Sequence, residues 1–143
     1  MVVDLADALL AAGLRVIEIT FRTAAAAKAI AKLASERPEM LVGAGTLLST
    51  DNVRQAIESG AKFGVAPGLN ECTVEAAQQA GLDFAPGVVT PSEVECALQL
   101  GCKLLKFFPA EQAGGVGMLK ALEEPYGQPE SSSSPLAAST SPI

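Results

Sequence analysis

The stretch QLGCKLLKF, residues 99–107, shows the unit from which the chain is built. Gly101 ends a helical pattern, because glycine readily adopts the left-handed conformation that closes a helix. A short polar step and an apolar run follow, which is typical of a buried strand. The same order recurs in AAGLRVIEI at 11–19, ESGAKFGVA at 58–66 and QAGLDFAPG at 79–87. The later units follow one another about every 20 residues, which indicates a β/α rhythm.

The rhythm predicts a parallel sheet covered by helices, because strands that alternate with helices are joined by right-handed crossovers. An open doubly wound sheet and a closed (β/α)8 barrel both fit this pattern. The expected strands are 15–20, 41–44, 62–66, 83–86 and 103–107, and the expected helices are 24–34, 52–59, 71–80 and 92–100. The expected residues that begin these helices are Thr23, Thr50 with Asp51, Asn70, and Thr90 with Pro91. TPSE at 90–93 has the spacing of a capping box.

Composition favours a single folded domain that handles small molecules or proteins. The 143 residues are 49% hydrophobic and 18% charged, which argues against general disorder. A net charge of −6 provides no basic surface for nucleic acid or an anionic membrane. The acidic N-terminal segment does not resemble a signal peptide, and no apolar run reaches the length of a membrane span. We therefore expect a cytoplasmic protein.

The composition changes after Tyr126, where GQPESSSSPLAASTSPI occupies 127–143. Serine, proline and small residues bury too little apolar area to offset the entropy of ordering. We expect a folded domain at 1–126 and a disordered tail at 127–143, with neither strand nor helix in the tail.

The reactive residue types limit the chemistry. Cys72, Cys96 and Cys102 have neither a disulfide pattern nor a metal-ligand spacing, and small buried apolar residues are the simplest interpretation. The chain has no histidine, which excludes Ser-His and Cys-His nucleophile pairs. GAGTLLS at 43–49 lacks the third glycine of a dinucleotide site and indicates a tight turn at a strand end. We expect no cofactor and no metal, so catalysis would use carboxylate, amine and hydroxyl groups.

Lys106 is the residue that a purely structural reading explains least well. It interrupts the apolar run of 104–108, where its ammonium would lose water unless something uses it. Desolvation lowers the pKa of a lysine and makes it a nucleophile toward ketones and aldehydes. The alternative is a lysine that reaches solvent at the rim of the sheet or pairs with a carboxylate.

Three other polar residues lie where strands end, at the edge that carries function in parallel β/α proteins. Glu18 could shuttle protons beside an amine, or it could form an ion pair with Arg15, Arg22 or Lys106. Arg22 offers a bidentate fork for a carboxylate or phosphate, although exposed arginines are common. Thr46 could donate to the same anion or cap the next helix.

Four segments resemble the 2-keto-3-deoxy-6-phosphogluconate aldolase family, also called 4-hydroxy-2-oxoglutarate aldolase. They are VIEITFRT at 16–23, VGAGTLL at 42–48, APGLNE at 66–71 and KFFPAE at 106–111. They occur in the order of the family and at similar separations, and GGVGMLKAL at 114–122 resembles its next helix. The similarity extends over about residues 4–126.

The resemblance implies a class I, metal-free aldolase on a (β/α)8 barrel. Such an enzyme cleaves 2-keto-3-deoxy-6-phosphogluconate to pyruvate and glyceraldehyde 3-phosphate, or 4-hydroxy-2-oxoglutarate to pyruvate and glyoxylate. The Schiff-base lysine of the family falls on Lys106 and its acid/base glutamate on Glu18. The residues that bind the carboxylate fall on Arg22 and Thr46, and Pro67 and Phe108 match the lining of the pyruvate pocket. The family also implies a homotrimer.

The resemblance stops before the family's last two strands, whose glycine-rich segments bind the substrate phosphate. We therefore expect a partial barrel without its first and last units, and unpaired edges at the strands 15–20 and 103–107. Such edges promote association. The alternative function is a non-catalytic truncated fragment or pseudoenzyme of the same family.

Overall fold

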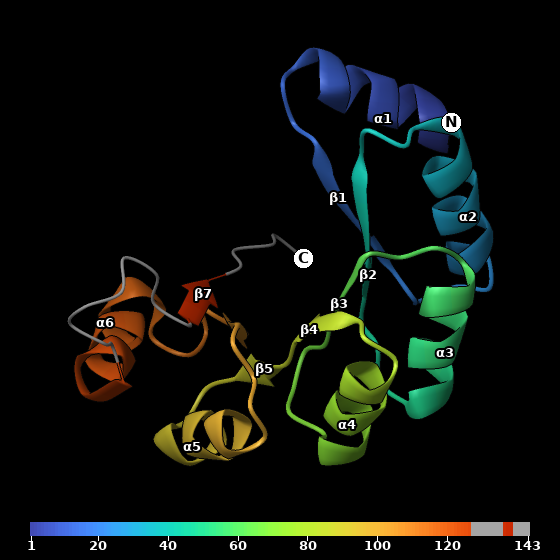
Figure 1. Ribbon diagram of the computed structural model, residues 1–143. Helices are drawn as coiled ribbons and strands as arrows, with labels where there is room; N and C mark the ends of the chain where they lie inside the picture. The colour runs from blue at the N-terminus through green and yellow to red at the C-terminus, as the bar shows by residue number, and fades with distance from the viewer. Residues whose placement is uncertain (127–135, 139–143) are drawn as a thin grey trace.

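A curved arrangement of parallel strands, with helices along its outer side, forms the body of the protein (Figure 1). The computed structural model describes residues 1–126 and 136–138. The elements in chain order are α1 (Val2–Ala11), β1 (Val16–Thr20), α2 (Ala26–Glu36), β2 (Leu41–Gly45), α3 (Thr50–Glu58), β3 (Phe63–Val65), α4 (Glu71–Gln79), β4 (Asp83–Ala85), β5 (Gly87–Val88), α5 (Pro91–Gln99), β6 (Leu105–Phe107), α6 (Gly115–Tyr126) and β7 (Leu136–Ala138). The predicted α/β class with parallel strands is confirmed.

The strands form two parallel ladders, β1-β2-β3-β4 and β5-β6-β7. The predicted strand at 83–86 is in fact divided, because Pro86 has no N–H to donate and separates β4 from β5. β4 pairs with β3, whereas β5 pairs with β6. The Pro86 carbonyl still accepts the N–H of Lys106 at 2.9 Å, so one continuous segment links both ladders. Together the ladders make one open arc, which is the predicted partial barrel.

The helix boundaries confirm part of the predicted capping. The glycines that end the repeated units, Gly13, Gly60, Gly81 and Gly101, all have positive φ angles. Asn70 caps α4 and Thr90 caps α5, as expected. The prediction was wrong for α2 and α3: α2 begins after Ala25 with no side-chain cap, and Ser49 caps α3 by accepting the Asn52 N–H. Ser49 immediately precedes the first helical residue, Thr50, so its hydroxyl is placed to accept an N–H of the first turn.

Two apolar cores lie between the strands and the helices. In the first, Ile17 and Ile19 of β1 pack with the buried Val42 and Ala44 of β2, beside residues of α1 and α2. In the second, Leu105 and Phe107 of β6 are fully buried with residues of α5 and α6.

Of the cysteines, only Cys102 is buried; Cys96 is half-buried and Cys72 is exposed, so the interpretation as buried residues was wrong for Cys72.

The edges of the arc differ from the expectation at one end. Residues 136–138 form β7, which pairs with β6 in parallel register, so the strand at 103–107 does not have an unpaired edge. The expectation of a tail without strands is wrong for these three residues, whose backbone supplies the partner that β6 needs. The rest of the expected disordered tail, 127–135 and 139–143, lies outside the described residues. β1 pairs only with β2 among the described strands.

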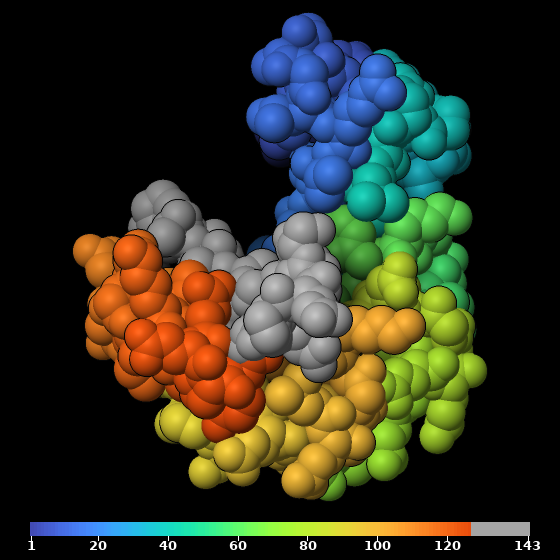
Figure 2. Space-filling model, turned by 60° about the vertical axis from the view of Figure 1, so that its left-hand side comes forward, coloured from blue at the N-terminus to red at the C-terminus, as the bar shows by residue number. Residues whose placement is uncertain are grey.

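The inner face of the arc exposes apolar side chains near the amino ends of its strands. Side chains alternate along a strand, so Val16 lies on the face opposite the buried outer core, as does its register partner Leu41. Val16 is 57% exposed, Leu41 46% and Leu104 49%. In a closed barrel such positions fill the interior, and here the open arc leaves them accessible. Figure 2 shows the open side between the N-terminal and C-terminal parts.

No helix within 1–126 combines the length and the apolar character needed to cross a bilayer.

A capping box fixes the loop between β5 and α5. The Glu93 carboxylate accepts the N–H groups of Val89 at 2.9 Å and Thr90 at 2.8 Å, together with the Thr90 hydroxyl at 2.9 Å. The Glu93 N–H donates in return to the Thr90 hydroxyl. Burial by itself raises the pKa of Glu93, but these donors outweigh it and hold the pKa below the ordinary value of 4.5.

We predict that the open edge of β1 makes the chain self-associate. Val16→Lys places a charge on the exposed inner face of this edge strand and should shift the chain toward monomer, because edge lysines oppose strand pairing. Light scattering coupled to gel filtration measures the change. Leu98→Lys, on the 39% exposed Leu98 of α5, is the matched control and should leave association unchanged. A wild-type chain that is monomeric at all micromolar concentrations would contradict the prediction.

We also predict that the capping box stabilises the fold in a pH-dependent way. A pKa that is lower in the folded state contributes stability above the unfolded-state pKa, and this contribution disappears as pH falls through the folded-state pKa. Glu93→Gln should therefore lower Tm at pH 7, and its difference from wild type should shrink below a pH of about 4. Thermal melts between pH 3 and 7 measure this difference. A constant difference across that range would show that the charge of Glu93 does not stabilise the fold.

Candidate active site

Lys106 occupies the middle of β6 and points to the inner face of the arc. Its neighbours Leu105 and Phe107 are fully buried in the outer core, so alternation directs Lys106 the other way. Its register partner is Gly87 of β5. Lys106 is half-buried, less than the sequence predicts, because the inner face is open. Its Nζ lies 4.9 Å from the centroid of the Phe108 ring, within cation–π range.

Glu18 occupies the equivalent inward position on β1. Ile17 and Ile19 pack in the outer core, and Glu18 pairs in register with Gly43 of β2. Its side chain leans toward the carboxyl end of β2 and lies over Gly45: a Cβ built on Gly45 would be 1.8 Å from Glu18 Oε1. The side chain is exposed. The carboxylate therefore lies over Gly45, the residue that precedes Thr46 at the carboxyl edge.

Thr46 follows β2 in an unusual backbone conformation. Its φ is 59°, the one positive φ outside glycine among residues 1–126. The flanking residues hold it: the Gly45 carbonyl accepts the Phe21 N–H at 2.8 Å, and the Leu47 N–H donates to Val65 at 3.1 Å. Such conformations cost energy and cluster at functional sites. The alternative role as a helix cap is wrong, because Ser49 caps α3.

Arg22 and Thr46 both lie at the carboxyl edge of the sheet, Arg22 after the end of β1 and Thr46 after the end of β2. Arg22 is exposed in the turn that follows β1, and the register of β1 with β2 places Thr20 opposite Gly45. The backbone bond from Phe21 to Gly45 ties this turn to the residue before Thr46. The structure thus brings Glu18, Arg22 and Thr46 into one region at the ends of β1 and β2.

Pro67 and Phe108 accompany Lys106 in a second region. A Cβ built on Gly87 would be 2.2 Å from the Pro67 carbonyl oxygen, so the backbone of Pro67 lies directly over Gly87. Gly87 is the register partner of Lys106. Phe108 follows β6, and both Phe108 and Pro67 are half-buried. All six residues predicted from the sequence therefore lie at or beside the carboxyl half of the inner face.

The two regions lie on opposite sides of the same arc. β3 connects them, since it pairs with β2 on one side and with β4 on the other. None of the ion pairs between described residues involves Glu18, Arg22 or Lys106. The structural alternatives in which these groups neutralise one another are thus wrong for the described part of the chain. The amine and the carboxylate both point to the inner face, and Arg22 and Thr46 lie at its carboxyl edge. An amine near a carboxylate is suited to imine chemistry on a keto acid.

The sequence reasoning missed three glycines that shape this space. Gly43 falls within the expected strand 41–44, whereas Gly45 was expected in the turn at the end of that strand; both lie within β2, where their register partners are Glu18 and Thr20. Gly87 lies in β5 beside Lys106. The signal in the sequence is the spacing of two residues between Gly43 and Gly45, which puts both on the same face of a strand. Glycine in a strand often marks close approach of another group.

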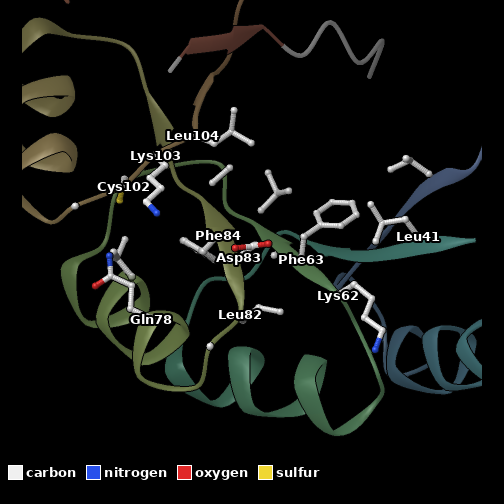
Figure 3. A pocket seen from close by; sticks show the side chains of 17 residues that line it. Leu41, Lys62, Phe63, Gln78, Leu82, Asp83, Phe84, Cys102, Lys103 and Leu104 are labelled. Atoms are coloured by element: carbon white, nitrogen blue, oxygen red, sulfur yellow. The ribbon is translucent and has the colours of Figure 1, made fainter. Parts of the chain in front are cut away.

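A separate hollow of about 650 Å³ lies near the amino ends of the strands (Figure 3). Phe63, Phe84 and Leu104 contribute apolar walls, and Asp83 and Lys103 add opposite charges. It is lined by residues at the starts of β3, β4 and β6, and neither Glu18 nor Lys106 lines it. The hollow reflects the open inner face at the end of the strands opposite to Thr46. Among the described residues, no three His, Cys, Asp or Glu side chains are grouped as metal ligands would be.

Comparison with known proteins gives a consistent result. A family model described as "Aldolase: KDPG and KHG aldolase" matches residues 1–131, where KDPG is 2-keto-3-deoxy-6-phosphogluconate. A 2-dehydro-3-deoxy-phosphogluconate aldolase of Haemophilus influenzae is 49% identical over 127 residues, which is 89% of this chain and 60% of the relative. The KHG/KDPG aldolase of Escherichia coli K12 is 44% identical over 126 residues, or 88% of this chain and 59% of the relative.

Solved structures agree. KDPG aldolase from Legionella pneumophila, captured with pyruvate as a covalent carbinolamine intermediate, superposes with a TM-score of 0.82 at 38% identity. The match covers 85% of this chain and 59% of that structure. KDPG aldolase of Zymomonas mobilis with 3-phosphoglycerate gives 0.80 at 40% identity, over 86% and 60% of the two chains. The chain therefore spans about 60% of the length of these relatives.

The family model matches residues 1–131, two relatives are 44% and 49% identical, and the partial barrel of this chain superposes on part of the solved aldolase structure. This chain belongs to the KDPG and KHG aldolase family.

Proposed function

We propose that the chain forms a Schiff base with a 2-keto acid through Lys106 and acts as a class I aldolase on 2-keto-3-deoxy-6-phosphogluconate. One observation carries the proposal: Lys106 and Glu18 both point to the inner face of one parallel arc, near its carboxyl edge. A relative captured with pyruvate as a carbinolamine supports imine chemistry in this fold. The family match and the sequence identities support the substrate class.

The mechanism assigns each step to a side chain. Lys106 Nζ attacks the C2 carbonyl, and Glu18 supplies and removes protons as the carbinolamine loses water to give a protonated imine. The imine accepts the electron pair of the C3–C4 bond, while Glu18 takes the proton of the C4 hydroxyl. Glyceraldehyde 3-phosphate leaves and an enamine remains. Protonation at C3 and hydrolysis then release pyruvate and regenerate the amine.

Arg22, Thr46, Pro67 and Phe108 bind and orient the keto acid in this scheme. The guanidinium of Arg22 and the hydroxyl of Thr46 are suited to the carboxylate, because both can donate hydrogen bonds to it. Pro67 and Phe108 flank Lys106 and provide apolar walls. The same chemistry applies to 4-hydroxy-2-oxoglutarate, which would give pyruvate and glyoxylate. A homotrimer and a cytoplasmic location stay predictions.

A non-catalytic member of the family is the second candidate. The exposure of Glu18 favours it, because a proton-transferring carboxylate works best when water is excluded. None of the six residues named above is assigned to the substrate phosphate. Trapping with pyruvate, which has no phosphate, distinguishes the candidates.

We predict that borohydride reduction in the presence of pyruvate attaches a stable adduct to Lys106. Reduction converts the imine to a secondary amine that cannot hydrolyse, and peptide mass spectrometry locates it. Lys106→Ala should abolish the adduct. Lys103→Ala removes an exposed lysine three residues earlier and should leave the adduct unchanged. An unmodified wild-type chain, with a full-length relative labelled in parallel, would favour the non-catalytic candidate.

We predict that Glu18→Gln keeps Lys106 reactive but slows imine formation. Loss of a general acid and base typically costs about 10²- to 10⁴-fold. Timed borohydride quenching measures the rate, and the final amount of adduct reports whether the amine remains accessible. Glu39→Gln, an exposed carboxylate outside the site, is the matched control. An unchanged rate in Glu18→Gln would remove Glu18 from the mechanism.

A further inference from the structure

The Glu18 carboxylate occupies the volume that a side chain at position 45 would fill. A Cβ built on Gly45 would lie 1.8 Å from Glu18 Oε1, 2.6 Å from Cδ and 2.9 Å from Cγ. Each distance is far below van der Waals contact. The close approach involves the distal half of Glu18, so any side chain at position 45 would displace the carboxylate.

We propose that Gly45 is a positioning residue that holds the Glu18 carboxylate at the carboxyl edge of β2. The inference rests on the proposed function, because it concerns the proton-transferring role of Glu18. Gly45 touches no substrate in this proposal; it acts through Glu18. The absence of a side chain creates a cradle that lets the carboxylate lie over the backbone just before Thr46.

The cradle is fixed by the backbone around it. The Gly45 carbonyl accepts the Phe21 N–H at 2.8 Å, which ties it to the end of β1. Two residues later, the Leu47 N–H donates to the Val65 carbonyl at 3.1 Å and ties the same segment to β3. Between these bonds Thr46 adopts its positive φ. The surface on which the carboxylate lies is therefore held from both neighbouring strands.

Other close glycines of the inner face do not act on Glu18. A Cβ on Gly43 would meet the Phe63 ring at 2.1 Å, and a Cβ on Gly87 would meet the Pro67 backbone at 2.2 Å. A substitution at either position therefore disturbs a ring or the main chain. At Gly45 the obstructing atoms belong to the end of a flexible side chain, so a methyl group can be admitted if the carboxylate moves. This difference makes Gly45 a clean test position.

We predict that Gly45→Ala retains the fold and slows imine formation with pyruvate by about 10²-fold, the typical cost of misplacing a catalytic group by about 1 Å. Glu18→Asp supplies the decisive comparison, because its shorter side chain withdraws the carboxylate from position 45. Glu18→Asp alone should also be slow. The double variant Gly45→Ala with Glu18→Asp should lose much less relative to Glu18→Asp than Gly45→Ala loses relative to wild type, because aspartate lacks the atoms that would lie 1.8 and 2.6 Å from the methyl group and keeps only Cγ, at 2.9 Å.

The readouts separate this proposal from the proposed function. Timed borohydride quenching gives the rate, and circular dichroism melts report the fold. Gly117→Ala, where a Cβ meets nothing within 4 Å, is the matched control and should keep the wild-type rate. A wild-type chain without an adduct overturns both proposals. An adduct in wild type with an equal rate in Gly45→Ala overturns the cradle alone, as does a strictly additive double variant. A loss of folding in Gly45→Ala that Glu18→Asp does not restore also overturns it.

Discussion

The register of the parallel strands is the constraint on which the rest of the site depends. Glu18 pairs with Gly43 and Lys106 pairs with Gly87, and these pairings place the proposed proton-transferring and imine-forming groups on the inner face. Because the side chains of a strand alternate, a slip of one residue in β1 would turn Glu18 into the outer core and Ile17 or Ile19 toward the open space. The packing of the half-buried Ile17 and Ile19 against the outer core therefore determines that the Glu18 carboxylate points to the inner face.

The inner face carries little side-chain bulk where the site lies. Gly43, Gly45 and Gly87 occupy inward positions of β2 and β5, and each vacated volume is filled by a group from another strand or loop: Phe63, Glu18 and Pro67. Glycine in a strand interior weakens the strand, because it gives up side-chain packing and costs more entropy to order. Here the absence of side chains lets the Glu18 carboxylate and the Pro67 backbone approach β2 and β5 closely.

Much of this arrangement is predictable from the sequence, and what is not predictable depends on three-dimensional contacts. The glycines that end the helices and the apolar runs that follow them located five strands, because both signals are local. The expected strand 83–86 proved to be divided at Pro86, which has no N–H to donate. Whether a missing N–H interrupts a strand depends on the neighbouring strand that would have accepted it, and the local sequence does not show that neighbour. The pairing of β7 with β6 joins the described residues 136–138 to a strand some thirty residues earlier, and composition alone favoured disorder there. The contact of Glu18 with Gly45 depends on the register between β1 and β2, which cannot be predicted from the sequence of either segment alone. Half-burial of Lys106 follows from the openness of the arc.

The two regions of the site differ in how firmly the fold holds them. Lys106 lies on β6, which has partners on both sides, β5 and β7, and its neighbours Leu105 and Phe107 are fully buried. Glu18 lies on β1, which pairs only with β2 among the described strands. Edge strands with few partners open locally at lower free energy than strands buried in a core. Local opening of β1 therefore displaces the Glu18 carboxylate at a lower free energy than the opening of β6 that would displace the Lys106 amine. In the proposed mechanism both imine formation and cleavage of the C3–C4 bond use the Glu18 carboxylate, so the open edge bears on every proton-transferring step, whereas the attacking amine depends on the more firmly held β6.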